Sequence, residues 1–171
     1  MDGVVLGLGS NRSYNGKSPV QLLSEACSMI ASFLPGIICS PVYRTAAMYV
    51  ENQDDFYNMV VSGSFDGTPR ELLDKIHAVE KSLGRDRSLE FRNGPRSLDV
   101  DIELFGNLVV HETDLIVPHE RFFERAFVLV PLLDILRKNA DSNRNSIECY
   151  ELRLKSLGDQ RISLECPPFS L

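Results

Sequence analysis

The stretch RNGPRSLDVDIELFG, residues 92–106, places two aspartates one residue apart in a segment that otherwise has the pattern of a buried strand. Aliphatic residues alternate there with mostly acidic ones, Leu98, Val100, Ile102 and Leu104 with Asp99, Asp101, Glu103 and Phe105. A period of two predicts a strand with the aliphatic side chains on one face and both aspartates on the other. The two carboxylates would then lie roughly 6.5–7 Å apart along the strand. This spacing fits a solvated edge strand or a cation held between the carboxylates.

A basic cluster directly precedes the aspartates. Residues 81–96 contain five basic side chains and two acidic ones, Lys81, Arg85, Arg87, Arg92 and Arg96 against Asp86 and Glu90. Such a run is often a solvated loop. Beside paired carboxylates it also suits a polyphosphate carried with a divalent metal, because arginines bind phosphates and carboxylates bind the ions.

Composition narrows the class of protein. The chain has 171 residues, 43% hydrophobic and 25% charged, and a formal net charge of −6, which disfavours non-specific binding to nucleic acid or to a membrane surface. The four cysteines have no metal-ligand spacing and fit reduced thiols in the cytoplasm. We expect a single domain over residues 1–171, with a core at about 4–136 and a C-terminal extension at 137–171. We also expect no membrane span and a monomer.

The order of the predicted elements indicates the fold. Start signals of serine or threonine followed by proline at positions 18–19 and 68–69 predict two helices, at 18–34 and 68–83. Strands are expected at 4–9, 37–44, 56–65 and 98–105, with a hairpin from 105 into 108–110. Residues 115–136 are expected to form a loop, then a short helix, then an apolar stretch that is broken at Pro131. This βαββαβ order predicts an α+β, ferredoxin-like fold, an antiparallel sheet with helices packed on it.

Two further motifs are less specific. GLGSN at 7–11 lacks the third glycine of a dinucleotide fingerprint, because Arg12 occupies that position. His119 follows Val117-Pro118 and precedes a basic and aromatic run, so it suits either a packed position or a donor to a phosphate.

Several segments, in order, resemble the 6-hydroxymethyl-7,8-dihydropterin pyrophosphokinase (HPPK) family. RNGPRSLDVDI resembles the family's Gly-Pro-Arg-x-x-Asp-x-Asp signature. The other matching segments are VVLGLGSN, SPVYRT, DDFYNMVV, LLDKIHAVEKSLGR and IVPHERFFERAFVLVPLLDI, which together extend from about residue 4 to 136. The resemblance implies a cytoplasmic transferase of folate biosynthesis that moves pyrophosphate from ATP to the hydroxymethyl group of the reduced pterin and releases AMP.

The resemblance also implies roles for particular residues. Two Mg²⁺ ions would be bound by Asp99 and Asp101, which with Arg85 and Arg96 form the expected catalytic set. The expected ATP-binding residues are Glu80, Arg85, Arg87, Arg96, His119 and Arg125. The expected pterin-binding residues are Thr45, Phe56, Asn58 and Phe127, with Phe127 stacking on the ring.

Four departures from the family pattern affect these expectations. Asn93 replaces a tryptophan that many members carry before Gly-Pro-Arg, and the loop between Gly84 and Gly94 is a residue longer than in some relatives, so that Arg87 could take a phosphate site in place of Arg85. Ala46-Ala47 replaces a segment that commonly contains proline. Glu103 stands where an apolar residue is usual, either as a third carboxylate near the metals or as a solvated side chain.

Three alternative functions share some of these features. An RNA-binding module has the same βαββαβ order, but NMVVSGSF lacks the basic and aromatic series that its third strand needs. A binding relative without catalytic activity stays open because of Asn93. A metal-dependent phosphatase or nuclease is the alternative enzyme, and AMP formed only with pterin would separate it from the kinase.

Overall fold

A computed structural model describes residues 3–47, 53–86, 94–158 and 160–171 of the chain. Its main sheet has the strand order β5-β1-β4-β3-β8, with β2 also pairing with β4. The strands are β1 (Val4–Ser10), β2 (Ile38–Cys39), β3 (Val42–Thr45), β4 (Phe56–Gly63), β5 (Asp99–Phe105) and β8 (Ile162–Cys166). Neighbouring strands pair antiparallel. The expected α+β, ferredoxin-like fold is confirmed.

Two helices on one face begin where the sequence predicts. In α1 (Pro19–Ala31) and α2 (Pro69–Ser82) the side chains of Ser18 and Thr68 accept a hydrogen bond from the third helical amide. The side chains of Gln21 and Glu71 in turn accept a hydrogen bond from the backbone amide of the cap residue, which completes a capping box at the start of each helix.

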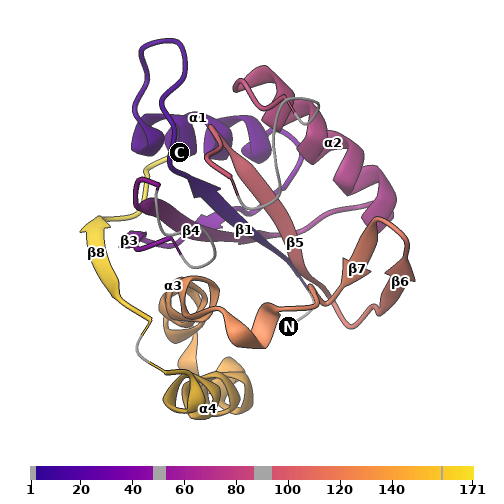
Figure 1. The fold of residues 1–171 in the computed structure, drawn as a ribbon. Coiled ribbons are helices and arrows are strands. Elements are labelled where there is room, and N and C mark those ends of the chain that lie inside the picture. Colours follow the sequence, from indigo (N-terminus) through magenta and orange to yellow (C-terminus); the bar gives the residue numbers. More distant parts are fainter. Residues whose placement is uncertain (1–2, 48–52, 87–93, 159) are drawn as a thin grey trace.

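The sheet separates two apolar cores, so the described chain is built in three layers (Figure 1). The larger core joins α1 and α2 to one face of the sheet through residues such as Leu6, Leu8 and Ile102. The smaller core lies on the other face, where Val5 and Val60 pack against α3 (Ala126–Arg137), which in turn carries α4 (Ala140–Ser156). Among the described residues, none of the helices combines the length and the apolar character that crossing a bilayer requires.

The alternation predicted for β5 holds only for its first half. The ladder with β1 shifts register between Val5 and Leu6, so that Ile102 pairs with Leu6 but Leu104 with Val5. Leu104 therefore packs in the smaller core, whereas Val100 and Ile102 pack in the larger one. The prediction that Leu104 shares their face was wrong, because a β-bulge adds a residue and reverses the parity of the residues after it.

Two expectations for the C-terminal half were also wrong. The hairpin formed by β6 (Val110–Glu112) and β7 (Leu115–Val117) pairs these two strands with each other and not with β5. The apolar stretch does not break at Pro131, since α3 continues through it. Burial of eight α3 residues, including Pro131 itself, outweighs the loss of one backbone donor.

The C-terminal residues add a further helix and strand. After the 3-10 helix η1 (Phe122–Glu124) and α3, helix α4 packs on α3, and β8 then pairs with β3 at the edge of the main sheet. The last strand thus returns to the sheet beside Thr45, whose ladder partner is Ile162.

Candidate functional site

The side chains of Asp99 and Asp101 project from the face of the sheet opposite α1 and α2. Their ladder partners on β1 are glycines, which carry no side chain. In the antiparallel ladder Asp99 lies opposite Gly9, and Asp101 lies opposite Gly7. A Cβ atom at Gly7 would lie 2.8 Å from Glu103 Oε1, and one at Gly9 would lie 2.9 Å from Asn58 Oδ1. The glycines of GLGSN therefore keep the floor of the site open, as a close approach to this strand requires.

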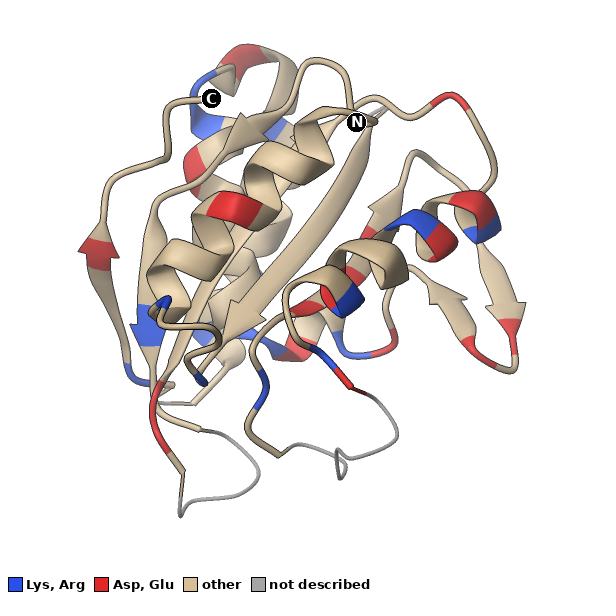
Figure 2. Cartoon of the chain, turned by 90° about the horizontal axis from the view of Figure 1, so that it is seen from above, with Lys and Arg blue, Asp and Glu red and all other residues tan. Residues whose placement is uncertain are grey.

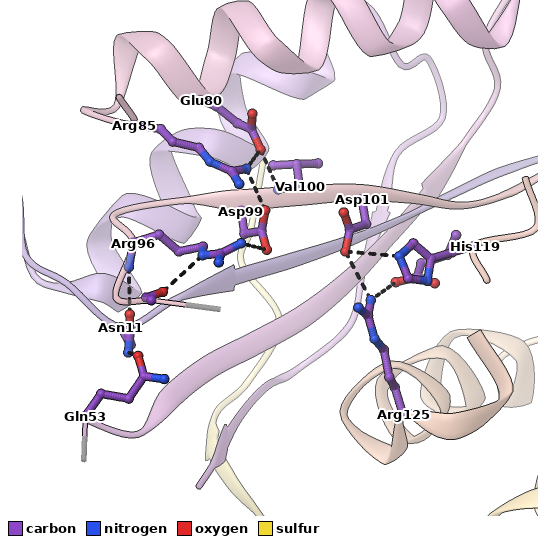
Figure 3. A network of polar contacts seen from close by, with 12 residues as sticks. Asn11, Gln53, Glu80, Arg85, Arg96, Asp99, Val100, Asp101, His119 and Arg125 are labelled. Carbon is purple, nitrogen blue, oxygen red and sulfur yellow. Dashed lines mark hydrogen bonds and ion pairs between the residues drawn. The ribbon is translucent and has the colours of Figure 1, made fainter. Parts of the chain in front are cut away.

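Asp99 is held by two arginines that come from different segments (Figure 3). Arg85, just after α2, donates from Nη1 to Asp99 Oδ1 at 2.5 Å, and Arg96, from the loop before β5, donates from Nη1 to Oδ2 at 2.7 Å. Arg85 also pairs with Glu80, whose Oε1 accepts the Val100 amide at 2.9 Å. Buried Glu80 thereby ties the end of α2 to β5 and orients Arg85.

The backbone of the Gly-Pro-Arg loop is held at the end of β1 by hydrogen bonds from Ser10 and Asn11. Asn11 Oδ1 accepts the Arg96 amide at 2.9 Å, and the Asn11 amide donates to the Arg96 carbonyl at 3.1 Å. Ser10 Oγ donates to the Ser97 carbonyl at 2.5 Å. The Asn11 side chain also donates to Gln53 Oε1 at 3.1 Å. Ser10 and Asn11, the last two residues of GLGSN, thus hold the segment that carries Arg96 in place.

Asp101 lies beside a third arginine and a histidine (Figure 3). Arg125, from the turn before α3, donates from Nη1 to Asp101 Oδ2 at 3.1 Å, and His119 Nε2 lies 3.9 Å from the same oxygen. His119 Nδ1 accepts the Arg121 amide at 3.1 Å, which leaves the ring proton on Nε2, the nitrogen that faces Asp101. Burial and the nearby Arg125 charge lower the pKa of His119 to about 4, so the ring is neutral at pH 7.

Glu103 is a third carboxylate of this group, and it is buried, with 1% of its side chain exposed. Its Oε1 lies 3.6 Å from Arg125 Nη1, and its Oε2 has no hydrogen-bond partner among the described residues. Burial, with the Asp101 charge adding to it, raises the pKa of Glu103 to about 8. Of the two possibilities left by the sequence, the structure places Glu103 inside the site and not in solvent.

Electrostatics distinguishes the two aspartates. Burial opposes ionisation of Asp99, but the charges of Arg85 and Arg96 outweigh it and hold its pKa below the usual range. Burial and the neighbouring Asp99 charge raise the pKa of Asp101, and Arg125 offsets only part of that rise. The three arginine side chains are at most 14% exposed, so solvent screens these pairs little.

A pocket opens beside the charged group, and it encloses about 730 Å³ with its mouth included. Its lining is mixed: it includes charged residues of the site, such as Asp99, Asp101 and Arg125, and also Phe56, Asn58, Thr45 and Phe127. Asn58 Nδ2 donates to Thr45 Oγ1 at 2.8 Å, and the Arg125 guanidinium lies 5.5 Å from the centre of the Phe127 ring. Such a pocket can hold a flat heterocycle between an aromatic face and an amide edge.

All but one of the site residues expected from the sequence lie around this pocket or in the adjoining ion-pair group; Arg87 lies outside the described residues, as does Asn93. Three residues that contact the site had no role assigned from the sequence. Asn11 and Gln53 were not assigned roles, although the serine and asparagine after the two glycines of β1 could have suggested a clamp. Gln160, which bonds the turn at Arg125, had no signal in the sequence at all.

The carboxylates of the site differ from a metal cage made by protein alone. Within the described parts of the chain, no group of three or more histidine, cysteine and acidic side chains is arranged to hold a metal ion. Mg²⁺, however, commonly takes one or two protein carboxylates and completes its shell with water and substrate phosphates. Asp99 and Asp101, 26% and 36% exposed, provide two such carboxylates at the pocket. The residues therefore fit Mg²⁺ bound together with a phosphate ligand.

Comparison with known proteins identifies relatives of the chain. The family model described as "7,8-dihydro-6-hydroxymethylpterin-pyrophosphokinase (HPPK)" matches residues 5–137. The chain is 38% identical over 132 residues to the "2-amino-4-hydroxy-6-hydroxymethyldihydropteridine pyrophosphokinase" of Aquifex aeolicus, a match that covers 77% of this chain and 79% of that protein. The protein of the same name from Helicobacter pylori is 34% identical, over 75% of this chain and 78% of its own length.

A plant relative is longer than the chain. The "Folate synthesis bifunctional protein, mitochondrial" of Arabidopsis thaliana is 36% identical over 82% of this chain, and the match covers 24% of that protein. The chain spans about a quarter of the length of this and similar plant relatives.

Proposed function

Since the chain belongs to the 7,8-dihydro-6-hydroxymethylpterin-pyrophosphokinase family, we propose that it transfers the pyrophosphoryl group of ATP to 6-hydroxymethyl-7,8-dihydropterin in folate synthesis. The hydroxymethyl oxygen attacks the β-phosphorus of ATP and loses its proton to solvent. The bond from the β-phosphorus to the oxygen that bridges to the α-phosphorus breaks, and AMP leaves. The products are AMP and the pterin diphosphate.

One observation carries this proposal. Two carboxylates and three arginines from separate segments converge beside a pocket with an aromatic wall and an amide edge. Phosphoryl transfer needs little covalent chemistry from a protein, which positions the groups and neutralises their charge. The cluster supplies the charges, and the pocket supplies a place for the acceptor.

The ion pairs suggest how ATP is received. Arg85, Arg96 and Arg125 are held by carboxylates before substrate arrives, so they are already aimed at the place where phosphates would lie. When phosphates replace the aspartates on these arginines, Asp99 and Asp101 become available to two Mg²⁺ ions. Asp99 and Asp101 would hold these ions, which would supply charge neutralisation at the phosphates. The arginine charges are paired with negative charges both before and after this exchange, which lowers the free-energy cost of the exchange.

The other assignments follow from position. Glu80 orients Arg85, and neutral His119 offers its Nε2 proton toward the side where Asp101 lies. Asn58 and Thr45 present polar atoms to the pterin edge, and Phe127 and Phe56 present aromatic faces. Arg87 keeps its proposed ATP contact as an expectation from the sequence.

We further propose that the protein acts as a monomer in the cytoplasm and does not engage nucleic acid or a membrane. All four cysteines are free, which fits a reducing compartment. The formal net charge is −6, and acidic and basic segments are interspersed along the described chain (Figure 2). A single basic face of the kind that binds nucleic acid is therefore not expected.

The test is AMP release by the purified protein with ATP and Mg²⁺, with and without 6-hydroxymethyl-7,8-dihydropterin. The matched control is 6-methyl-7,8-dihydropterin, which fits the same pocket but lacks the attacking hydroxyl. AMP that requires the hydroxymethyl compound and disappears with EDTA supports the proposal. AMP or phosphate released without pterin would instead indicate a phosphohydrolase, and no release from folded protein would indicate a binding relative.

A further inference from the structure

The C-terminal segment contacts the turn that carries Arg125, although it lies outside the residues that the family model matches. Three hydrogen bonds reach this turn, one from α4 and two from Gln160, which lies two residues before β8. Gln160 Nε2 donates to the Glu124 carbonyl at 2.8 Å, and the Ala126 amide donates to Gln160 Oε1 at 2.8 Å. Arg153 Nε donates to the Phe123 carbonyl at 2.7 Å.

The Gln160 side chain hydrogen-bonds to the backbone on both sides of Arg125. The Glu124 carbonyl belongs to the peptide unit before Arg125, and the Ala126 amide belongs to the unit after it. One side-chain amide therefore bridges the two planes that meet at the Arg125 Cα atom. This bridge fixes Arg125 at φ −114° and ψ 100°, an extended conformation between η1 and α3.

The bridge also replaces a missing helix cap. Arg125 is the N-cap residue of α3, and its side chain makes no capping hydrogen bond. The first amides of a helix have no partner within the helix and need one from elsewhere. Gln160, 34 residues away in sequence, provides it for Ala126. A guanidinium has no acceptor and cannot cap an amide itself, and the Arg125 side chain donates instead to Asp101.

The position of Gln160 is itself fixed by the fold. Two residues later Ile162 pairs with Thr45 in the ladder between β8 and β3. On the other side, Tyr150 of α4 packs against Phe122 and Phe123, with ring centres 5.4 Å and 6.1 Å away. The segment that contains Gln160 is thus anchored on one side to β3, through β8, and on the other side to η1, through α4.

We propose that Gln160 is a positioning residue for the site: it holds the Arg125 turn so that Arg125 faces Asp101 and Phe127 forms the pocket wall. The proposal rests on the proposed function for the ligands of Arg125 and Phe127. Because Arg125 lies between the two bridged peptide units and Phe127 follows the second of them, release of the bridge moves the phosphate contact and the pterin contact together.

The test compares Gln160→Ala, which removes both bonds, with Gln160→Glu, which keeps the acceptor for Ala126 but loses the donor to Glu124. Glu165→Ala, at an exposed position of β8, is the matched control. Three quantities are measured: hydrogen exchange of the Ala126 amide by NMR, the melting temperature, and kcat and KM for the pterin. The amide exchange reports on the bridge whether or not the protein turns over substrate.

We expect faster exchange at Ala126 in Gln160→Ala and protection kept in Gln160→Glu. In Gln160→Ala, kcat falls and the pterin KM rises, each about three- to tenfold, the factor that one or two hydrogen bonds of ordinary net strength give. Gln160→Glu lies between Gln160→Ala and the wild type, and Glu165→Ala matches the wild type.

Unchanged exchange or unchanged kinetics in Gln160→Ala overturns the proposal. Equal kinetic losses in Glu165→Ala, in step with melting temperature, overturn it too, because the segment would then only stabilise the fold. If the wild type makes no pterin-dependent AMP, the proposed function fails, and exchange at Ala126 alone decides whether Gln160 holds the turn.

Discussion

Asp101 lies directly opposite Gly7 in the ladder between β5 and β1, so its carboxylate projects over a strand position that has no side chain. Asp99 has the same relationship to Gly9. The two glycines explain how two carboxylates, three arginines and an open pocket fit on one face of a strand pair. Larger residues on β1 would fill the space that the site needs.

Gly9→Ala tests this relationship. The new Cβ would lie 2.9 Å from Asn58 Oδ1, so the Asn58 amide must move away from Thr45 Oγ1. We expect the dissociation constant for the pterin to rise about tenfold, the equivalent of one displaced hydrogen bond, with little change in that for ATP. Calorimetric titration with each substrate measures both.

Gly158→Ala is the control for Gly9→Ala, because a Cβ there meets no atom within 4 Å. Pterin affinity that is equal in the two variants would show that the open floor at Gly9 does not serve the pocket.

The carboxylates are tested by Asp99→Asn and Asp101→Asn, which keep the shape and remove the charge. We expect each to lower kcat by at least about 100-fold, since even partners beyond the ligands of a metal site cost 10–100-fold. The proteins should stay folded, because both side chains are partly exposed at the pocket. Steady-state AMP formation and circular dichroism measure the two effects.

Asp114→Asn is the matched control, since Asp114 is an exposed aspartate paired with Arg70 outside the pocket. Turnover near the wild-type rate in both site variants would contradict the assignment of Asp99 and Asp101 to the metal.

Arg96→Lys separates charge from geometry. Lysine keeps the positive charge but lacks the planar fork that donates to Asp99 and to the Gly94 carbonyl. We expect the Arg96 contact to strengthen in the transition state, so kcat should fall at least about tenfold while KM for ATP changes little. A rise in KM with unchanged kcat would assign Arg96 to ground-state binding instead.

Glu103→Gln should change how stability depends on pH. Folding raises the pKa of Glu103 from 4.5 to about 8, so between these values the folded protein keeps a proton that the unfolded chain releases. This carboxyl's contribution to stability is therefore complete below pH 4.5 and is lost as pH rises through 8. Glutamine stays neutral. The free energy of unfolding of Glu103→Gln, relative to that of the wild type, should therefore rise by on the order of 3 kcal/mol between pH 5 and 8.

Urea unfolding in EDTA across that range measures the gain, with no divalent cation to bind the neighbouring aspartates. A difference between Glu103→Gln and the wild type that does not vary with pH would show that Glu103 is ionised in the folded protein.

Local signals in the sequence were sufficient for most of the fold. Capping boxes at Ser18 and Thr68 predicted the helix starts, the segments expected as strands at 4–9 and 56–65 form β1 and β4, and alternation predicted the first half of β5. The β-bulge near Glu103 could not be predicted, because register depends on the partner strand β1 and not on β5 alone. Pro131 was misleading for a similar reason: its cost is local, whereas the burial that offsets it comes from the sheet and α4.

The site was predictable where a motif carried it. Asp99, Asp101 and Arg96 come from one continuous segment, and the resemblance to the family brought in Asn58, His119 and Phe127. Gln160 could not be found in this way, since a single glutamine in a polar tail has no pattern, and its two bonds depend on how β8 returns to β3. The burial of Glu103 likewise became visible only when Arg125 and Gly7 were placed around it.

The central claim is that two phosphates move together from ATP to the pterin. The most direct measurement uses ATP labelled separately at the α-, β- and γ-phosphorus, with the pterin product isolated after turnover. We expect that the β and γ labels both appear in the pterin product and that the α label stays in AMP. A product that carries the γ label alone, with ADP released, would contradict the claim.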